Sequence, residues 1–139
     1  MPCHLTIWGK FDPDALAASS SLPIKQTWRE GEPSRRGRTH EDSGLLLCAS
    51  ASDFNDYKRQ FAEAEAFLRQ HEAALAVMTT RADTLESVLD FGLLQTPHPA
   101  FFRRLPASLI QIAATLRLSV ELSFYAFEGD DVSSNLPES

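Results

Sequence analysis

The sequence predicts an α+β fold in which a single-layer mixed sheet of about five strands carries its helices on one face. Three observations lead to this prediction. Several short segments alternate apolar and polar residues, as strands with one buried face do. Longer segments carry apolar residues at the spacing of one helix face. The segments follow one another as strand, helix, strand, strand, helix, strand, helix and strand, an order typical of a mixed sheet packed against helices.

The first predicted strand covers residues 3–10, where apolar residues recur at every second position: Cys3, Leu5 and Ile7. A short helix at about residues 13–20 follows. Asp12 is a favoured N-cap residue, and Pro13 fits the first helical position because its missing N–H would have no partner there. The serines and the proline after this segment end the helix.

Two further strands and a loop complete the N-terminal half. Residues 24–30 are predicted as the second strand. Residues 32–43 contain almost no apolar residue but several of the types that favour turns, so we expect a loop and the most mobile internal segment. Residues 45–49, Leu-Leu-Leu-Cys-Ala, form a continuous apolar run, which predicts a strand covered on most of both faces.

The longest predicted helix covers about residues 53–80, with Ser52 or Asp53 as its cap. It carries the clearest periodicity in the chain, because apolar residues recur every seven positions, at Phe54, Phe61, Leu68 and Leu75. A core-facing helix and a coiled-coil seam both produce such a stripe, and we favour the core-facing helix. His71 marks a kink or a break into a second helix.

The C-terminal half supplies the remaining elements. Residues 84–94 alternate as a strand. Residues 105–116 have helical spacing, with Pro106 in the first turn, and residues 118–127 alternate again. We expect this last helix and strand to be buried and to pack on each other, with Leu109 and Leu122 each at the centre of its element's buried face. Changing Leu109 or Leu122 to Ala is therefore expected to cost about 2–5 kcal/mol.

Length and composition limit the number of domains and the classes of protein to which this chain can belong. The 139 residues make one domain, which we place at residues 1–128, and residues 129–139 are predicted to form a disordered acidic tail. The net charge of −6 argues against general nucleic acid binding, and no apolar run is long enough for a membrane span. The N-terminus lacks the pattern of a signal peptide, so we expect a cytoplasmic protein.

Several short motifs resemble a known family. They are Leu5 to Gly9 leading into Phe11-Asp12-Pro13, then Trp28 to Glu32, the helix start at Leu105-Pro106, and the stretch from Leu116 to Tyr125. Together they are similar to the bacterial domain of unknown function 4279 family, and the similarity covers nearly the whole chain. The final strand of that family is more acidic, whereas Glu121 and Ser123 stand here. The resemblance implies this fold and carries no activity or catalytic residue.

Motifs for catalysis, metals and cofactors are missing from the sequence. The two cysteines, Cys3 and Cys48, lie in apolar runs and are expected to be buried and inert. The histidines and cysteines show no zinc-ligand spacing, and there is no nucleophile elbow and no glycine-rich phosphate loop. We therefore expect no metal and no cofactor, and we lean against an enzyme.

One charged cluster is unusual for an acidic chain. Arg29, Arg35, Arg36 and Arg38 lie close together with Lys25, and they are the candidate binding residues. Arginine pairs well with carboxylates and phosphates, so the cluster predicts a surface for an anionic partner. A solvated loop balanced by neighbouring acids explains the same residues.

Two hypotheses for function follow. The first is a small non-enzymatic bacterial module that binds a protein partner with an acidic surface. The second is an enzyme or small-ligand-binding protein with a site on the sheet face, formed by residues such as His4, Glu121 or Tyr125. A concave polar pocket on that face would favour the second hypothesis.

Overall fold

The computed structural model of the protein describes residues 2–98 and 100–126. This part of the chain forms five strands and four helices: β1 (Cys3–Gly9), α1 (Pro13–Ala18), β2 (Ile24–Trp28), β3 (Ser43–Ser50), α2 (Tyr57–Gln70), α3 (Glu72–Thr79), β4 (Thr84–Leu94), α4 (Ala107–Thr115) and β5 (Ser119–Tyr125). The predicted tail at 129–139 lies outside the described residues.

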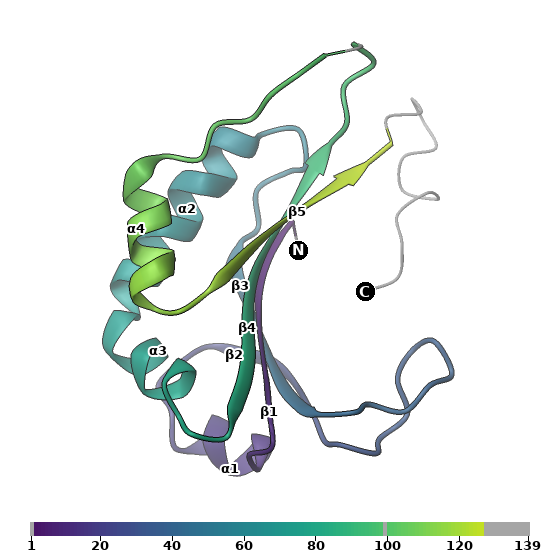
Figure 1. Ribbon diagram of the computed structural model, residues 1–139, viewed down its shortest axis with the longest axis vertical. Coiled ribbons are helices and arrows are strands. Elements are labelled where there is room, and N and C mark those ends of the chain that lie inside the picture. The colour runs from purple at the N-terminus through teal and green to yellow at the C-terminus, as the bar shows by residue number, and fades with distance from the viewer. Residues whose placement is uncertain (1, 99, 127–139) are drawn as a thin grey trace.

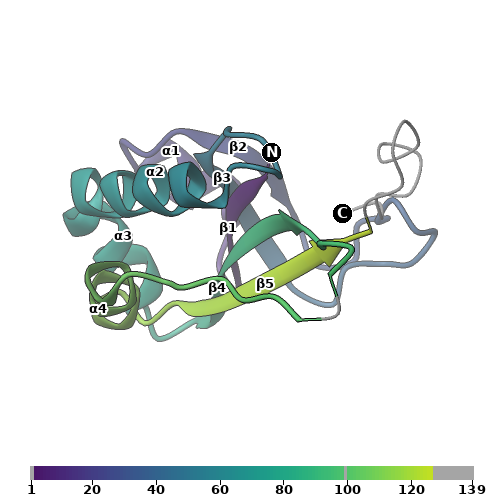
Figure 2. The same ribbon diagram turned by 90° about the horizontal axis from the view of Figure 1, so that it is seen from above.

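The predicted architecture of a mixed five-stranded sheet with helices on one face is confirmed. The strand order is β2-β3-β1-β4-β5, so the first strand of the chain is the centre of the sheet. β1 is antiparallel to β3 and β4, β2 is antiparallel to β3, and β4 is parallel to β5. Helices α2, α3 and α4 lie on one face, as the views in Figure 1 and Figure 2 show from two directions.

The core lies between the sheet and these helices. On the central strand, Leu5 and Ile7 are fully buried, and their neighbours on β3 and β4 are buried beside them. Phe61 of α2 meets Phe91 of β4 edge to face, with ring centroids 4.8 Å apart. The apolar alternation of the strands and the stripe on the long helix thus meet in one cluster.

The predicted long helix is two helices. α2 begins at Tyr57 and not at residue 53, because Asp56 is the cap and accepts a hydrogen bond from the Arg59 N–H at 3.2 Å. Neither Ser52 nor Asp53 caps it, so that expectation is wrong. His71 separates α2 from α3 and has φ −108° and ψ 18°, which departs from helical geometry. The predicted break at this residue is confirmed.

The last helix and strand lie at a margin of the sheet and not at its centre. Arg117 has a φ of 58°, and this left-handed residue turns the chain from α4 directly into β5. β5 is an edge strand, so Leu122 is only half-buried, and Val120 and Phe124 are 36% and 43% exposed. The expectation of a buried final strand holds only in part, because the side chains of its core face stay partly accessible, whereas Leu109 on α4 is buried as predicted.

Candidate functional site

The face of the sheet turned away from the helices is the candidate site, and we call it the open face. Its side chains alternate along each strand with those of the core. Figure 2 shows no described helix over it. Most of its residues are neither fully buried nor fully exposed. The open face comprises His4, Thr6, Trp8, Gln26, Trp28, Leu46, Cys48, Glu86, Val88, Asp90, Leu94, Glu121, Ser123 and Tyr125.

A row of polar groups crosses the middle of the open face. His4 on β1 is paired in register with Cys48 on β3 and with Asp90 on β4. The His4 Nε2 atom lies 3.6 Å from Asp90 Oδ2, so the two groups form an ion pair when the imidazole is protonated. Ser123 of β5 donates its hydroxyl hydrogen to Asp90 Oδ1 at 2.7 Å. Four neighbouring strands thus contribute one side chain each to this row.

The two cysteines lie on opposite faces. Cys3 is fully buried on the core side, and burial raises the pKa of its thiol, with a smaller contribution from the nearby Asp90 carboxylate. Such a thiol is inert, as predicted. Cys48 is only half-buried and belongs to the open face. The prediction that Cys48 is buried in a doubly covered strand is therefore wrong.

Tyr125 closes one end of the open face. Its ring meets Phe54 edge to face, with centroids 5.2 Å apart. Phe54 belongs to the segment before α2, and its ring lies against Gly92, where any β-carbon would overlap it. Burial raises the pKa of the Tyr125 phenol, and the Asp90 and Glu121 carboxylates raise it further. Tyr125 therefore stays protonated and is a hydrogen-bond donor at neutral pH.

A polar hollow of about 380 Å³ lies at the other end of the open face. Trp8 and Glu86 line it from the sheet, and Arg38, His40 and Asp42 line it from the connection between β2 and β3. The sequence pattern does not indicate this hollow, since its two walls lie far apart in the chain. It also lacks the three residues expected for a sheet-face pocket, which lie nearer the middle and the far end of the face.

The connection between β2 and β3, residues 29–42, is a hydrogen-bonded hairpin and not an irregular loop. The Gly31 N–H donates to the His40 carbonyl at 2.8 Å, and the His40 N–H donates to the Glu32 carbonyl at 2.9 Å. Gly37 lies at the tip with φ 71°, which favours glycine there. Figure 1 shows the hairpin projecting beyond the sheet on the open side. Its predicted mobility stays a prediction.

Two contacts fix the base of this hairpin. Lys10 pairs with Glu30 and with Asp42, and both carboxylates raise the pKa of the ammonium group through hydrogen bonds, Asp42 most strongly. The His40 ring stacks on Trp28, with centroids 5.3 Å apart and planes inclined by 22°. The Trp28 indole in turn lies over Gly44, where a side chain would collide with it. Glycine at this position lets the hairpin base lie close to the sheet.

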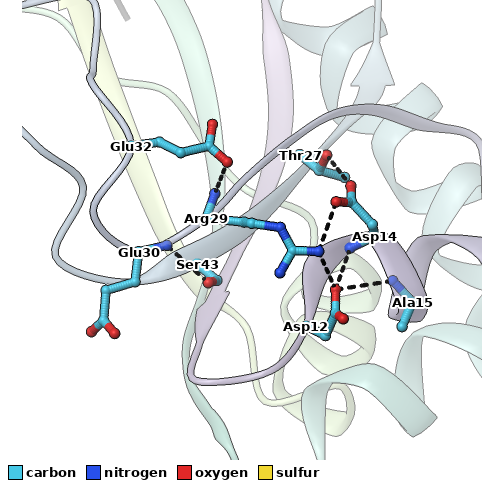
Figure 3. Close-up of polar contacts among 8 residues, drawn as sticks. All are labelled: Asp12, Asp14, Ala15, Thr27, Arg29, Glu30, Glu32 and Ser43. Carbon is cyan, nitrogen blue, oxygen red and sulfur yellow. Dashed lines mark hydrogen bonds and ion pairs between the residues drawn. The ribbon is translucent and has the colours of Figure 1, made fainter.

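The four candidate arginines do not form one site. Figure 3 shows Arg29 turned toward the start of α1, where its guanidinium lies 2.8 Å from Asp12 and 2.9 Å from Asp14. Asp12 also caps α1, as predicted, by accepting hydrogen bonds from the backbone N–H groups of Asp14 and Ala15. Arg29 is thus part of an ion-pair network on the surface beside α1, separate from the other three arginines, and its role in binding stays a prediction.

The other three arginines lie near the tip of the hairpin. Arg35, Arg36 and Arg38 are exposed, and Arg38 also lines the polar hollow. They are separated from the acidic groups of Asp90 and Glu121, which lie farther along the open face and toward β5. The basic charge of the open face is therefore gathered at the tip of the hairpin, because Glu41, Asp42 and Glu86 line the hollow beside it together with Arg38.

A second, smaller hollow of about 210 Å³ opens where β4 ends and α2 begins. Arg103 lies over the Tyr57 ring, 4.4 Å from its centroid, and Phe54 and Leu94 complete the wall. The sequence does not indicate that Tyr57 and Arg103 meet, because the two residues are distant in the chain and share no motif for a functional site. The cation–π contact orders the segment that leads into α4.

Known proteins supply no further guidance. Comparisons with models of protein families, with curated proteins and with solved structures find no match. Within residues 2–98 and 100–126, no group of acidic, histidine and cysteine side chains is arranged to hold a metal ion. No helix in this part of the chain is both long and apolar enough to cross a membrane. The resemblance to the domain of unknown function 4279 family stays a prediction.

Proposed function

We propose that the protein is a small non-enzymatic module of the bacterial cytoplasm that binds a protein partner on its open face. The observation that carries this proposal is the mixture of half-exposed apolar and polar side chains across that face. Trp8, Leu46, Val88 and Leu94 are all partly accessible on it. Apolar and aromatic groups interrupted by a few hydrogen-bonding groups are typical of the centre of a protein interface.

The hairpin gives this surface a charged margin. Arg35 and Arg38 are exposed, and Arg38 lines the hollow beside Trp8. Guanidinium groups bind carboxylates in a bidentate manner, so we expect an acidic segment of a partner at the arginine-rich tip of the hairpin. The hollow itself is lined by Glu41, Asp42 and Glu86 as well as Arg38, so that segment is expected beside the hollow and not in it. The central row of His4, Asp90 and Ser123 then supplies directional hydrogen bonds that select among partners.

Affinity capture from a bacterial lysate tests this proposal. The Leu46→Asp substitution introduces a charge on the open face, and the matched control is Ala62→Asp, at an exposed position of α2. We expect Leu46→Asp to abolish capture of the partner and Ala62→Asp to retain it. Charge reversal at Arg35, Arg36 and Arg38 is expected to weaken capture, most visibly at low salt. Identical sets of captured proteins for all variants would contradict the proposal.

A second candidate function, an enzyme on the same face, is favoured by one specific arrangement. Cys48, His4 and Asp90 are consecutive neighbours across three strands, in the order thiol, imidazole, carboxylate. In such a row the imidazole accepts the thiol proton, the thiolate attacks an ester carbonyl, and the leaving alcohol recovers the proton. Water then hydrolyses the acyl-thiol and regenerates the thiol.

Hydrolysis of a chromogenic acetate ester distinguishes the two candidates. An enzyme loses turnover on both Cys48→Ser and His4→Ala, and keeps it on Cys3→Ser if that variant folds, because Cys3 lies on the other face. A binding module shows the same slow background rate in all four proteins. Circular dichroism of each variant serves as the folding control.

A further inference from the structure

We propose that β5 is a self-pairing edge through which two copies of this chain join antiparallel into one continuous sheet. This surface is separate from the open face, and the proposal does not depend on the proposed function. β5 pairs with β4 on one side only. In Figure 1 it crosses in front of the other strands, so that its outer edge faces the viewer. No described strand pairs with that edge.

The backbone of β5 determines which groups are available for pairing. The Gln95 N–H donates to the Tyr125 carbonyl at 2.8 Å, so the peptide groups of Tyr125 face β4. Alternate residues of a strand direct their peptide groups to the same side. The N–H and C=O groups of Val120, Leu122 and Phe124 therefore face outward. An edge strand with such a row is a template for another strand.

The side chains at this edge are apolar on the helix side. Val120 and Phe124 are 36% and 43% exposed, and Leu122 between them is half-buried. Phe101, in the segment before α4, meets Phe124 edge to face with ring centroids 5.6 Å apart and is itself 37% exposed, so it extends this apolar surface. Natural proteins usually protect edge strands with charge or proline, and this side of β5 has neither. Burying these side chains against a second copy removes apolar area from water.

One register satisfies both the backbone and the side chains. If the two-fold axis passes through Leu122, Leu122 faces itself, and Val120 faces Phe124 of the partner subunit. The peptide groups of all these residues face outward, so the two residues of each pair exchange both of their backbone N–H···O=C hydrogen bonds. On the other side of the sheet, Glu121 then faces Ser123 and not another acid. A shift that places Glu121 opposite Glu121 brings like charges together and is disfavoured.

Sedimentation equilibrium tests the association. We expect the wild-type mass to rise with concentration from 15.4 kDa toward twice that value. The Val120→Glu/Phe124→Glu variant places acids opposite each other at both outer pairs, and we expect it to stay monomeric. The Val120→Lys/Phe124→Glu variant places Lys opposite Glu and is expected to recover the dimer. Within one strand these positions are about 13 Å apart, so the recovery must arise between chains.

A disulfide at the two-fold axis provides a second measurement. Leu122→Cys puts two thiols at directly opposed positions, where the spacing of paired strands permits a disulfide. We expect mild oxidation to convert this variant into a covalent dimer, whereas Val77→Cys, exposed on α3, stays largely monomeric. A wild-type protein that keeps the monomer mass at its highest soluble concentration would overturn the proposal and leave the edge to a strand of another protein. Failure of the Lys/Glu variant to recover the dimer, with both double variants folded by circular dichroism, would overturn this register.

Discussion

The two faces of the sheet are built from alternate residues of the same strands, yet they exclude water to very different extents. On β1, Leu5 and Ile7 are fully buried under the helices, while the His4 side chain on the open face remains 20% accessible. The covered face is mainly apolar, with Ser87 and Thr27 among its few polar residues. The open face combines aromatic, aliphatic and charged groups. The difference indicates that the covered face contributes most of the folding stability, which leaves the open face free for recognition.

The largest difference between the faces is expected within β4. Phe91 is fully buried on the covered face, whereas Val88 is half-buried on the open face. We expect Phe91→Ala to lower the free energy of unfolding by about 3–5 kcal/mol and Val88→Ala by about 1 kcal/mol or less. Urea denaturation of both variants measures this. Similar losses at the two positions would mean that the open face is covered as fully as the other.

A second pair sharpens the comparison within the covered face. Leu109 of α4 is fully buried, and Leu122 of β5 lies at the edge of the same core. Leu109→Ala is expected to cost about 2–5 kcal/mol, as the sequence suggests. Leu122→Ala is expected to cost clearly less, because an edge residue leaves a cavity open to water. The free energies of unfolding are compared below the concentration at which any dimer forms.

A third prediction concerns pH. Glu63 of α2 accepts hydrogen bonds from Ser52 and Ser50, and these bonds, that of Ser52 most strongly, lower the pKa of its carboxyl group below 4.5. A depressed folded-state pKa stabilises the protein fully above the unfolded value, and this stabilisation is lost as the pH falls through the folded value. We expect Glu63→Gln to flatten the loss of urea resistance below about pH 4.5. Glu72→Gln, at an exposed site on α3, leaves the profile unchanged.

The smallest effect is expected at the hairpin tip. Charge reversal of Arg35, Arg36 and Arg38 should change Tm by about 2 °C or less, since exposed charges contribute little to stability. Arg29→Glu should lower Tm more, because it places an acid beside Asp12 and Asp14 at the cap of α1. Thermal unfolding followed by circular dichroism compares the two. Equal shifts would mean that the ion pairs of Arg29 with Asp12 and Asp14 contribute no more to stability than the charges at the hairpin tip.

Local signals in the sequence predicted where helices and strands lie in the chain better than which strands are adjacent in the sheet. The alternation at residues 84–94 has the same bounds as β4, and Asp12 and His71 mark a helix start and a helix break as expected. The edge position of β5 could not be predicted, because a strand at an edge and a strand at the centre alternate alike. The start of α2 was missed because several residues before it are equally good caps.

The candidate site was harder to predict, because it is formed by residues from several strands that are distant in the sequence. The row of Cys48, His4 and Asp90 depends on the strand order and register, which no single segment encodes. The hairpin at residues 29–42 lacks apolar residues, so its composition resembles that of a loop although its backbone is paired. Arg29 belongs by sequence to the basic cluster, but its partners are residues of another element.

The central position of β1 has a consequence for how the chain folds as it is synthesised. β1 is the first of the five strands to leave the ribosome, yet both of its neighbours, β3 and β4, are made later. Leu5 and Ile7 therefore have no sheet partner on the β4 side until Leu89 and Ser87 have been translated. β2 and β3 are closer in the chain and can pair first. During translation the nascent protein thus exposes the apolar strand that becomes the centre of its sheet, and exposed apolar segments of this kind are prone to aggregation until their partners are made.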